Sequence, residues 1–155
     1  MKKIVFCLFV FFMVMACFVN AQAAINFSGT WLLDINKSDL GIANPTAVAK
    51  MNKVTFVIKQ TDTQLTIERS TGETASYNLD GSESVNKLPG GAESKTKMNW
   101  VGNTLTAKTM SNINGMDVGM TDERSLSADG KEMVLKVTRQ TPSGEKKQVI
   151  IYKKQ

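Results

Sequence analysis

The sequence predicts an all-β fold, a single antiparallel up-and-down β-barrel of 8 to 10 strands. Apolar and polar residues alternate with a period of two through most of the chain, as in strands that bury one face. Dipeptides that favour tight turns separate these alternating runs. Beyond the N-terminal apolar block, no run of 11 or more residues shows the three- and four-residue spacing of a helix.

The first 23 residues have the order of a secretory signal peptide. Lys2 and Lys3 precede an apolar block from Ile4 to Val19, and the small-x-small site Ala21-Gln22-Ala23 follows. This order predicts a signal peptide over 1–23, with cleavage after Ala23. The apolar block has about 16 residues, fewer than the roughly 20 that span a bilayer, so no transmembrane segment is expected after cleavage. We therefore expect a secreted or periplasmic protein.

A lipid anchor is the alternative for the same segment. Val14-Met15-Ala16-Cys17 partly resembles the bacterial lipobox, in which a small residue precedes the modified cysteine. In that case Cys17 is lipidated and the protein is a membrane-anchored lipoprotein. Under either alternative, the remainder of the chain, 24–155 after signal cleavage, is long enough to form one domain with its own core.

The composition of the mature chain excludes several kinds of chemistry. Lys2, Lys3 and both cysteines precede the cleavage site, so 17 basic and 14 acidic residues remain, without a block of like charges. No nucleic-acid partner is expected from this balance. The chain contains no histidine, and without cysteine it lacks a thiol nucleophile, a histidine-based triad and the usual zinc or haem ligands. We expect no catalysis and no cofactor.

Individual strands are visible as runs that keep one phase. The clearest apolar sets are Val54/Phe56/Ile58, Leu65/Ile67, Ala75/Tyr77/Leu79 and Met98/Trp100. Predicted hairpin turns lie at Asp80-Gly81, Gly102-Asn103, Asn114-Gly115, Asp129-Gly130 and Ser143-Gly144. Two stretches depart from the pattern: 35–53, with a short helical piece at 47–51, and 84–92, which reads as a long loop.

A barrel in an outer membrane is not favoured by the sequence. Such barrels carry aromatic girdles and an apolar outer band, whereas only six aromatic residues follow the signal. Five lysines instead recur on the face opposite the apolar positions: Lys59, Lys95, Lys97, Lys108 and Lys136. A soluble barrel places its charges in this way.

The segment Phe27-Ser28-Gly29-Thr30-Trp31 resembles the Gly-x-Trp opening of the calycins, the lipocalins and the fatty-acid-binding proteins. A broader resemblance is to uncharacterised exported bacterial proteins that look lipocalin-like. The matching pieces are Lys37-Ser38, Tyr77-Asn78-Leu79-Asp80-Gly81, Trp100-Val101-Gly102-Asn103-Thr104-Leu105 and Leu126-Ser127-Ala128-Asp129-Gly130-Lys131. The resemblance implies a lipocalin-like barrel over 24–155, and it implies a fold more than a task.

Arg139 shares a strand face with Met133, Leu135 and Val137, so its charge needs a partner. In lipocalins, an arginine near the end of the last barrel strand lies across the opening tryptophan. The resemblance therefore implies that Arg139 covers Trp31 and closes the barrel beside Gly29. Two alternatives stay open, in which Arg139 holds a ligand carboxylate or simply reaches water.

The expected function is to bind a small hydrophobic molecule of lipid or fatty-acid type. The expected lining residues are Arg139, Tyr77, Trp100, Phe56, Met98 and Met133, although the aromatics and methionines are equally suited to an ordinary core. The alternative is a structural or interaction protein whose barrel is filled by side chains and which acts through rim loops at 35–53 and 84–92.

Overall fold

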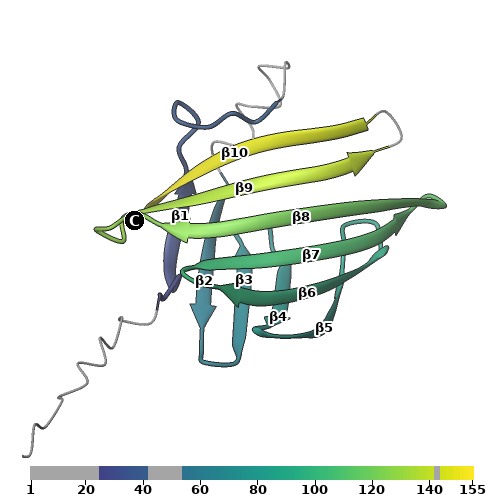
Figure 1. The fold of residues 1–155 in the computed structure, drawn as a ribbon, viewed down its shortest axis with the longest axis horizontal. Helices are drawn as coiled ribbons and strands as arrows, with labels where there is room; N and C mark the ends of the chain where they lie inside the picture. The colour runs from purple at the N-terminus through teal and green to yellow at the C-terminus, as the bar shows by residue number, and fades with distance from the viewer. Residues whose placement is uncertain (1–24, 42–53, 142–143) are drawn as a thin grey trace, which may run out of the picture.

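The computed structural model describes residues 25–41, 54–141 and 144–155, and this part of the chain forms ten β-strands (Figure 1). The strands are β1 (Gly29–Leu33), β2 (Thr55–Gln60), β3 (Gln64–Arg69), β4 (Thr74–Asn78), β5 (Asp80–Lys87), β6 (Glu93–Val101), β7 (Thr104–Ile113), β8 (Met116–Leu126), β9 (Glu132–Thr141) and β10 (Gly144–Lys154). The described ranges contain no apolar helix long enough to span a membrane.

All ten strands belong to one antiparallel sheet that curls back on itself. The order is β4-β3-β2-β1-β10-β9-β8-β7-β6-β5, so the first strand pairs with the last and every other pair is consecutive. In Figure 1, the long strands β7 to β10 cross in front of β1 to β4. The predicted up-and-down β-barrel is confirmed, with the number of strands at the upper end of the expected range.

The barrel has one seam, between β4 and β5, where side chains replace the backbone ladder. These two strands pack against each other, but they form the two ends of the hydrogen-bonded order. Asn86 Oδ1 accepts from the Ser76 amide at 2.8 Å, and Asn86 Nδ2 donates to the Ser76 carbonyl at 2.9 Å. The Asn78 amide donates to Ser84 Oγ at 2.8 Å. Two side chains from β5 therefore join the strands.

One end of the barrel is closed by a packed core around the first strand. Trp31 is fully buried, and its Nε1 donates to the Phe27 carbonyl at 2.8 Å. Phe27 is also fully buried and stacks on Trp100 with ring centroids 5.9 Å apart. The same core includes Leu33, Leu40, Ile58, Leu65, Leu79, Met98, Leu105, Ala107, Met133, Val137, Ile150 and Tyr152. The predicted position of the Gly-x-Trp motif in the first strand is confirmed.

Three of the predicted turns connect paired strands: Gly102-Asn103, Asn114-Gly115 and Asp129-Gly130. Asn114 and Gly115 both have positive φ, 53° and 80°, which is the backbone geometry of a two-residue hairpin turn. The predicted turn at Ser143-Gly144, the helical piece at 47–51 and the signal peptide fall wholly or partly outside the described residues.

Two expectations from the sequence differ from the structure. Asp80-Gly81 does not form a hairpin, because Asp80 begins β5, which is not paired with β4, and the register of β5 with β6 shifts between Asp80 and Glu83. The expected loop at 84–92 is shorter, since β5 continues to Lys87 and only the turn 88–92 connects it to β6. Asn86, read as a loop residue, is instead needed in the strand to close the seam.

Candidate functional site

The inward face of the sheet is not uniformly buried. Five apolar or aromatic residues in the inward phase of their strands are half-buried and pack against the buried core: Phe56, Ile67, Tyr77, Met120 and Leu135. They come from five different strands, β2, β3, β4, β8 and β9. We take these residues and the polar groups beside them as the candidate site.

A buried ion pair points into this interior from β8. Arg124 Nε lies 3.0 Å from Asp122 Oδ1, and Arg124 Nη2 lies 3.5 Å from Asp122 Oδ2. The side chains are 10% and 5% exposed, respectively. Their paired neighbours on β7 and β9 are apolar: Leu105, Ala107, Leu135 and Val137. Two opposite charges are thus held together among aliphatic side chains, where the loss of either partner is costly.

The surroundings of this pair shift the pKa values of Arg124 and of two nearby tyrosines upward. Burial alone would lower the pKa of Arg124, but the charge of Asp122 and its hydrogen bond outweigh that effect and raise the pKa. Burial raises the pKa of Tyr77 on β4 and of Tyr152 on β10, and the positive charge of Arg124 acts on both phenols. Near neutral pH the interior therefore holds one ion pair and two neutral tyrosines, whose hydroxyls donate or accept hydrogen bonds.

Small hydroxyl residues extend the polar part of the interior across β6 and β7. Thr96 and Thr109 face each other in the register, and their Oγ1 atoms lie 2.9 Å apart. Thr109 is two residues along β7 from Ala107, the partner of Asp122, so the threonine pair lies beside the ion pair. A hydroxyl both donates and accepts. The pair thus keeps one O–H that is not used between the two threonines.

The residues predicted to line a cavity divide into two groups. Met98 and Met133 are fully buried in the core, and Trp100 stacks on Phe27. Phe56 and Tyr77 are half-buried on the inward face, and Phe56 packs edge-on against Tyr152, with ring centroids 4.6 Å apart. The first three residues belong to the packed core, while the last two belong to the candidate site.

The cation over Trp31 is not Arg139. Lys154 Nζ lies 5.4 Å from the Trp31 ring centroid, and Lys154 pairs with Trp31 in the sheet. The Lys154 amide donates to the carbonyl of Lys131, which immediately precedes β9, whereas Arg139 is eight residues further along the chain on β9, roughly 26 Å away. Arg139 instead faces Met120 and Lys146 across the sheet and is exposed. The expected Trp31–Arg139 contact is therefore corrected to Trp31–Lys154.

Gly29 has a structural role at the same place. Its φ is 142°, and a Cβ added there would lie 2.5 Å from Lys154 Cε. The glycine thus gives the lysine stem room to pass over the neighbouring strand and reach the indole. The sequence suggested that Gly29 helps to close the barrel beside Arg139, whereas its neighbour in the structure is a lysine from the last strand.

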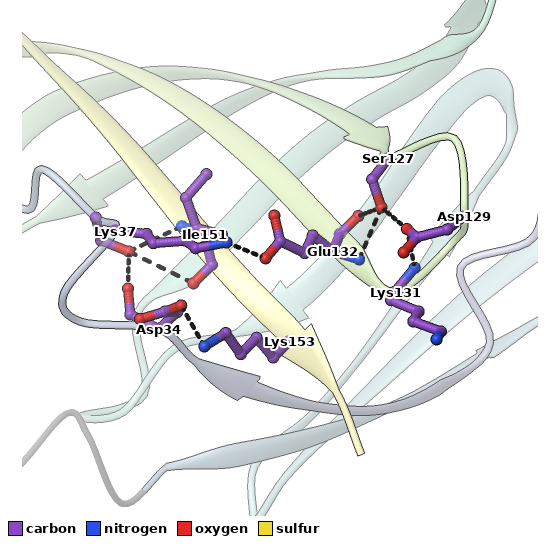
Figure 2. A network of polar contacts seen from close by, with 9 residues as sticks. Asp34, Lys37, Ser127, Asp129, Lys131, Glu132, Ile151 and Lys153 are labelled. Carbon is purple, nitrogen blue, oxygen red and sulfur yellow. Dashed lines mark hydrogen bonds and ion pairs between the residues drawn. The ribbon is translucent and has the colours of Figure 1, made fainter.

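Several pieces that carried the family resemblance form a polar network on the outside of the barrel (Figure 2). Lys37 pairs with Glu132, and Lys153 Nζ lies 2.8 Å from Asp34 Oδ2. Ser38 Oγ donates to the Asp34 carbonyl at 2.7 Å and accepts from the Ile151 amide at 2.9 Å. The segment after β1 is thereby fixed onto β9 and β10.

The turn between β8 and β9 is fixed by the same network (Figure 2). Ser127 Oγ donates to Asp129 Oδ1 at 2.6 Å and accepts from the Glu132 amide at 2.9 Å. A shallow hollow of about 590 Å³ lies on this rim, lined by Ser127, Ala128, Asp129, Lys131, Glu132, Lys153 and Lys154. Ser127 pairs with Asp129, while Glu132 and Lys153 pair with Lys37 and Asp34 outside the hollow, so we assign the network to structure and not to ligand binding.

The ion pair was not predicted, although the sequence carries a signal for it. Asp122 and Arg124 fall in the same phase as Met120 and Leu126, which places an acid and a base two residues apart on the inward face. Glu123, the next residue in the chain, points outward and is exposed. An acid and a base in phase with core residues are the pattern of an internal ion pair.

Solved structures with the same architecture are fatty-acid and bile-acid binding proteins. The chain is similar to zebrafish ileal bile acid-binding protein in complex with cholic acid, at 18% identity and a TM-score of 0.57, over 83% of this chain and 98% of the other. It is also similar to fatty acid-binding protein from Drosophila melanogaster brain tissue, at 22% identity and a TM-score of 0.56, over 83% of this chain and 99% of the other. Fatty-acid-binding protein 1 of Echinococcus granulosus is similar at 18% identity and a TM-score of 0.55, over 83% of this chain and 96% of the other.

These likenesses establish the calycin-like fold that the Gly-x-Trp opening implied. No protein-family model and no curated protein matches the chain. The more specific resemblance to exported bacterial lipocalin-like proteins therefore stays a prediction.

Proposed function

We propose that this protein binds a small, largely apolar molecule of lipid type inside its barrel. The observation that carries the proposal is the barrel-shaped sheet, whose inward face carries half-buried apolar side chains such as Phe56, Ile67 and Leu135. Apolar walls with a few polar groups that converge on one region are typical of small-molecule sites. Here the polar groups are Asp122, Arg124 and the nearby tyrosines.

The similar structures support the same class of ligand. The zebrafish protein is described with cholic acid, and the Drosophila and Echinococcus proteins are fatty-acid-binding proteins. All share this sheet with the present chain over most of their length. Their roles favour binding over catalysis, in line with a described interior whose charged side chains, Asp122 and Arg124, neutralise each other.

The rival function is a packed barrel that acts through its rim. The likeness to ligand-binding barrels favours the first function over this rival. The rival also relied on a long loop at 84–92, and half of that segment is strand. A ligand-binding assay separates the two functions directly.

Ala75 offers a way to fill the interior without breaking the sheet. It is half-buried on the inward face of β4, opposite Ile67. We expect Ala75→Phe to weaken binding of the neutral fluorescent probe Nile red by at least about tenfold, because the added ring occupies ligand space. Fluorescence titration measures this effect. Ala128→Phe, on the exposed rim turn, is the matched control and should bind like the wild type. If the wild-type protein does not bind the probe, the ligand-binding proposal is wrong.

We further propose that the domain acts after export. The order of Lys2-Lys3, the apolar block and Ala21-Gln22-Ala23 supports cleavage after Ala23. The full-length chain expressed in a bacterium should appear in the periplasm or medium with a mass that begins at Ala24. A chain that starts at Cys17 and carries added lipid mass would instead support the lipoprotein alternative, and an intact Met1 would rule out both.

A further inference from the structure

Resting on the proposed function, we infer that the ligand of this barrel carries an uncharged, hydroxyl-type polar group and not a carboxylate. The argument starts from the charge inside the barrel. Asp122 and Arg124 are the buried charges of the described interior, and they are paired with each other through two contacts. The pair has no net charge to offer to a ligand.

An anionic head placed beside Arg124 would also lie beside Asp122. The anion is attracted by the guanidinium and repelled by the carboxylate. These two effects largely cancel, because Arg124 Nε and Asp122 Oδ1 lie only 3.0 Å apart. The anion would still lose its hydration on entering the barrel, and no interior charge would replace that loss. A neutral hydroxyl avoids both difficulties.

The remaining cations in the inward phase lie at the ends of the strands. Arg69, Arg139, Lys146 and Lys154 share the phase of the inner wall, yet all four are exposed. The ammonium group of Lys154 also forms a cation–π contact with Trp31. The positive charge of Arg69 acts on the phenols of Tyr77 and Tyr152, but an exposed charge is screened by water and salt and is a weaker receptor for an anion than a buried one.

The polar wall itself has the chemistry that recognises a hydroxyl. The threonine pair Thr96 and Thr109 keeps one free O–H, the Asp122 carboxylate has spare acceptor capacity, and the guanidinium has spare donors. A ligand hydroxyl is both donor and acceptor, so it can bind at once to an acceptor on Asp122 and to a donor on Arg124. Other inward-facing strands carry apolar side chains, such as Phe56 on β2 and Ile67 on β3, which suit a hydrocarbon. The inferred ligand class is a neutral amphipathic molecule, such as a long-chain alcohol, a monoacylglycerol or a sterol.

The test compares two ligands that share a chain and differ in the head. Oleyl alcohol and oleic acid are titrated at pH 8 against the protein loaded with Nile red, and displacement gives both affinities. The alcohol should bind at least about tenfold more tightly than the oleate. Tighter binding of oleate overturns the inference and leaves the proposed function intact. If neither ligand binds and Nile red does not bind either, the proposed function itself fails.

Variants then assign the preference to the ion pair. Asp122→Asn leaves Arg124 without a counter-charge, so oleate should gain at least about tenfold and the preference should shrink or reverse. Asp117→Asn, an exposed residue of the same strand, is the control and should keep the wild-type preference. Unchanged selectivity in folded Asp122→Asn overturns the assignment.

A double variant, Asp122→Leu with Arg124→Leu, keeps the test decisive if Asp122→Asn does not fold. It removes both charges, so oleyl alcohol should bind several-fold more weakly while oleate stays weak. Loss of oleate binding alone, with the alcohol unaffected, would identify Arg124 as a carboxylate receptor and overturn the inference.

Discussion

Replacing Trp31 with alanine should lower the free energy of unfolding by about 3 to 5 kcal/mol. The indole is fully buried, its Nε1 donates to the Phe27 carbonyl, and Lys154 Nζ lies over its ring, 5.4 Å from the centroid. The substitution leaves a void at the point where the first and last strands meet, together with an unpaired buried carbonyl. Urea titration followed by circular dichroism measures the effect.

Trp100→Ala provides the comparison for this prediction. Trp100 is half-buried and stacks on Phe27 at the edge of the same core, so its loss should cost clearly less than that of Trp31. A cost below about 1 kcal/mol for Trp31→Ala would show that the closed end does not depend on the indole.

Replacing Asp122 alone with leucine should cost about 3 to 5 kcal/mol, as expected when a buried pair loses one partner. The guanidinium of Arg124 would then face Leu105 and Leu135 without a counter-charge. The same urea titration measures this loss. Glu123→Leu is the matched control, because Glu123 is the exposed neighbour in the chain, and it should change stability by less than about 0.5 kcal/mol.

The double variant Asp122→Leu with Arg124→Leu should regain most of the lost stability. Replacing a whole buried ion pair by apolar side chains of similar size is often neutral or stabilising. Such recovery would mean that the pair is kept for what it does to a ligand and not for folding. Equal losses in the single and double variants would show instead that Leu is not tolerated at this position of β8.

The sequence predicted the barrel well because its signals are local. Alternation in runs such as Phe56/Ile58 and Met98/Trp100 fixes which face is buried, and Asn114-Gly115 fixes the register of β7 with β8. The Gly-x-Trp opening added the position of the first strand in the core. The five lysines predicted to face outward are all exposed.

The same local signals could not identify the residue that covers Trp31. Alternation assigns Arg139 to the inward face but gives no height along the barrel, and height depends on how β10 and β1 are aligned across the sheet. Lys154, near the end of the chain, turned out to lie at the correct level. The face of the sheet on which a residue lies follows from alternation within its own strand. Its position along the barrel axis depends on the register with the neighbouring strands.

The ion pair illustrates a different limit. A charged residue in an alternating run is ordinarily solvated, and only the phase of Asp122 and Arg124 relative to Met120 and Leu126 sets them apart. Their closeness to Tyr77 and Tyr152 depends on strands distant in sequence, which meet only when the sheet curls. The candidate site is therefore a product of the closed topology.

The seam between β4 and β5 has a consequence for how this chain behaves among its own copies. A sheet that does not close fully has two edges, and free edges recruit strands from other molecules into aggregates. Here the amides of Ser76 and Asn78 are already bonded to Asn86 and Ser84, so an approaching foreign strand finds these donors taken. The side chains that join the two strands thus also guard the protein against self-association at high concentration.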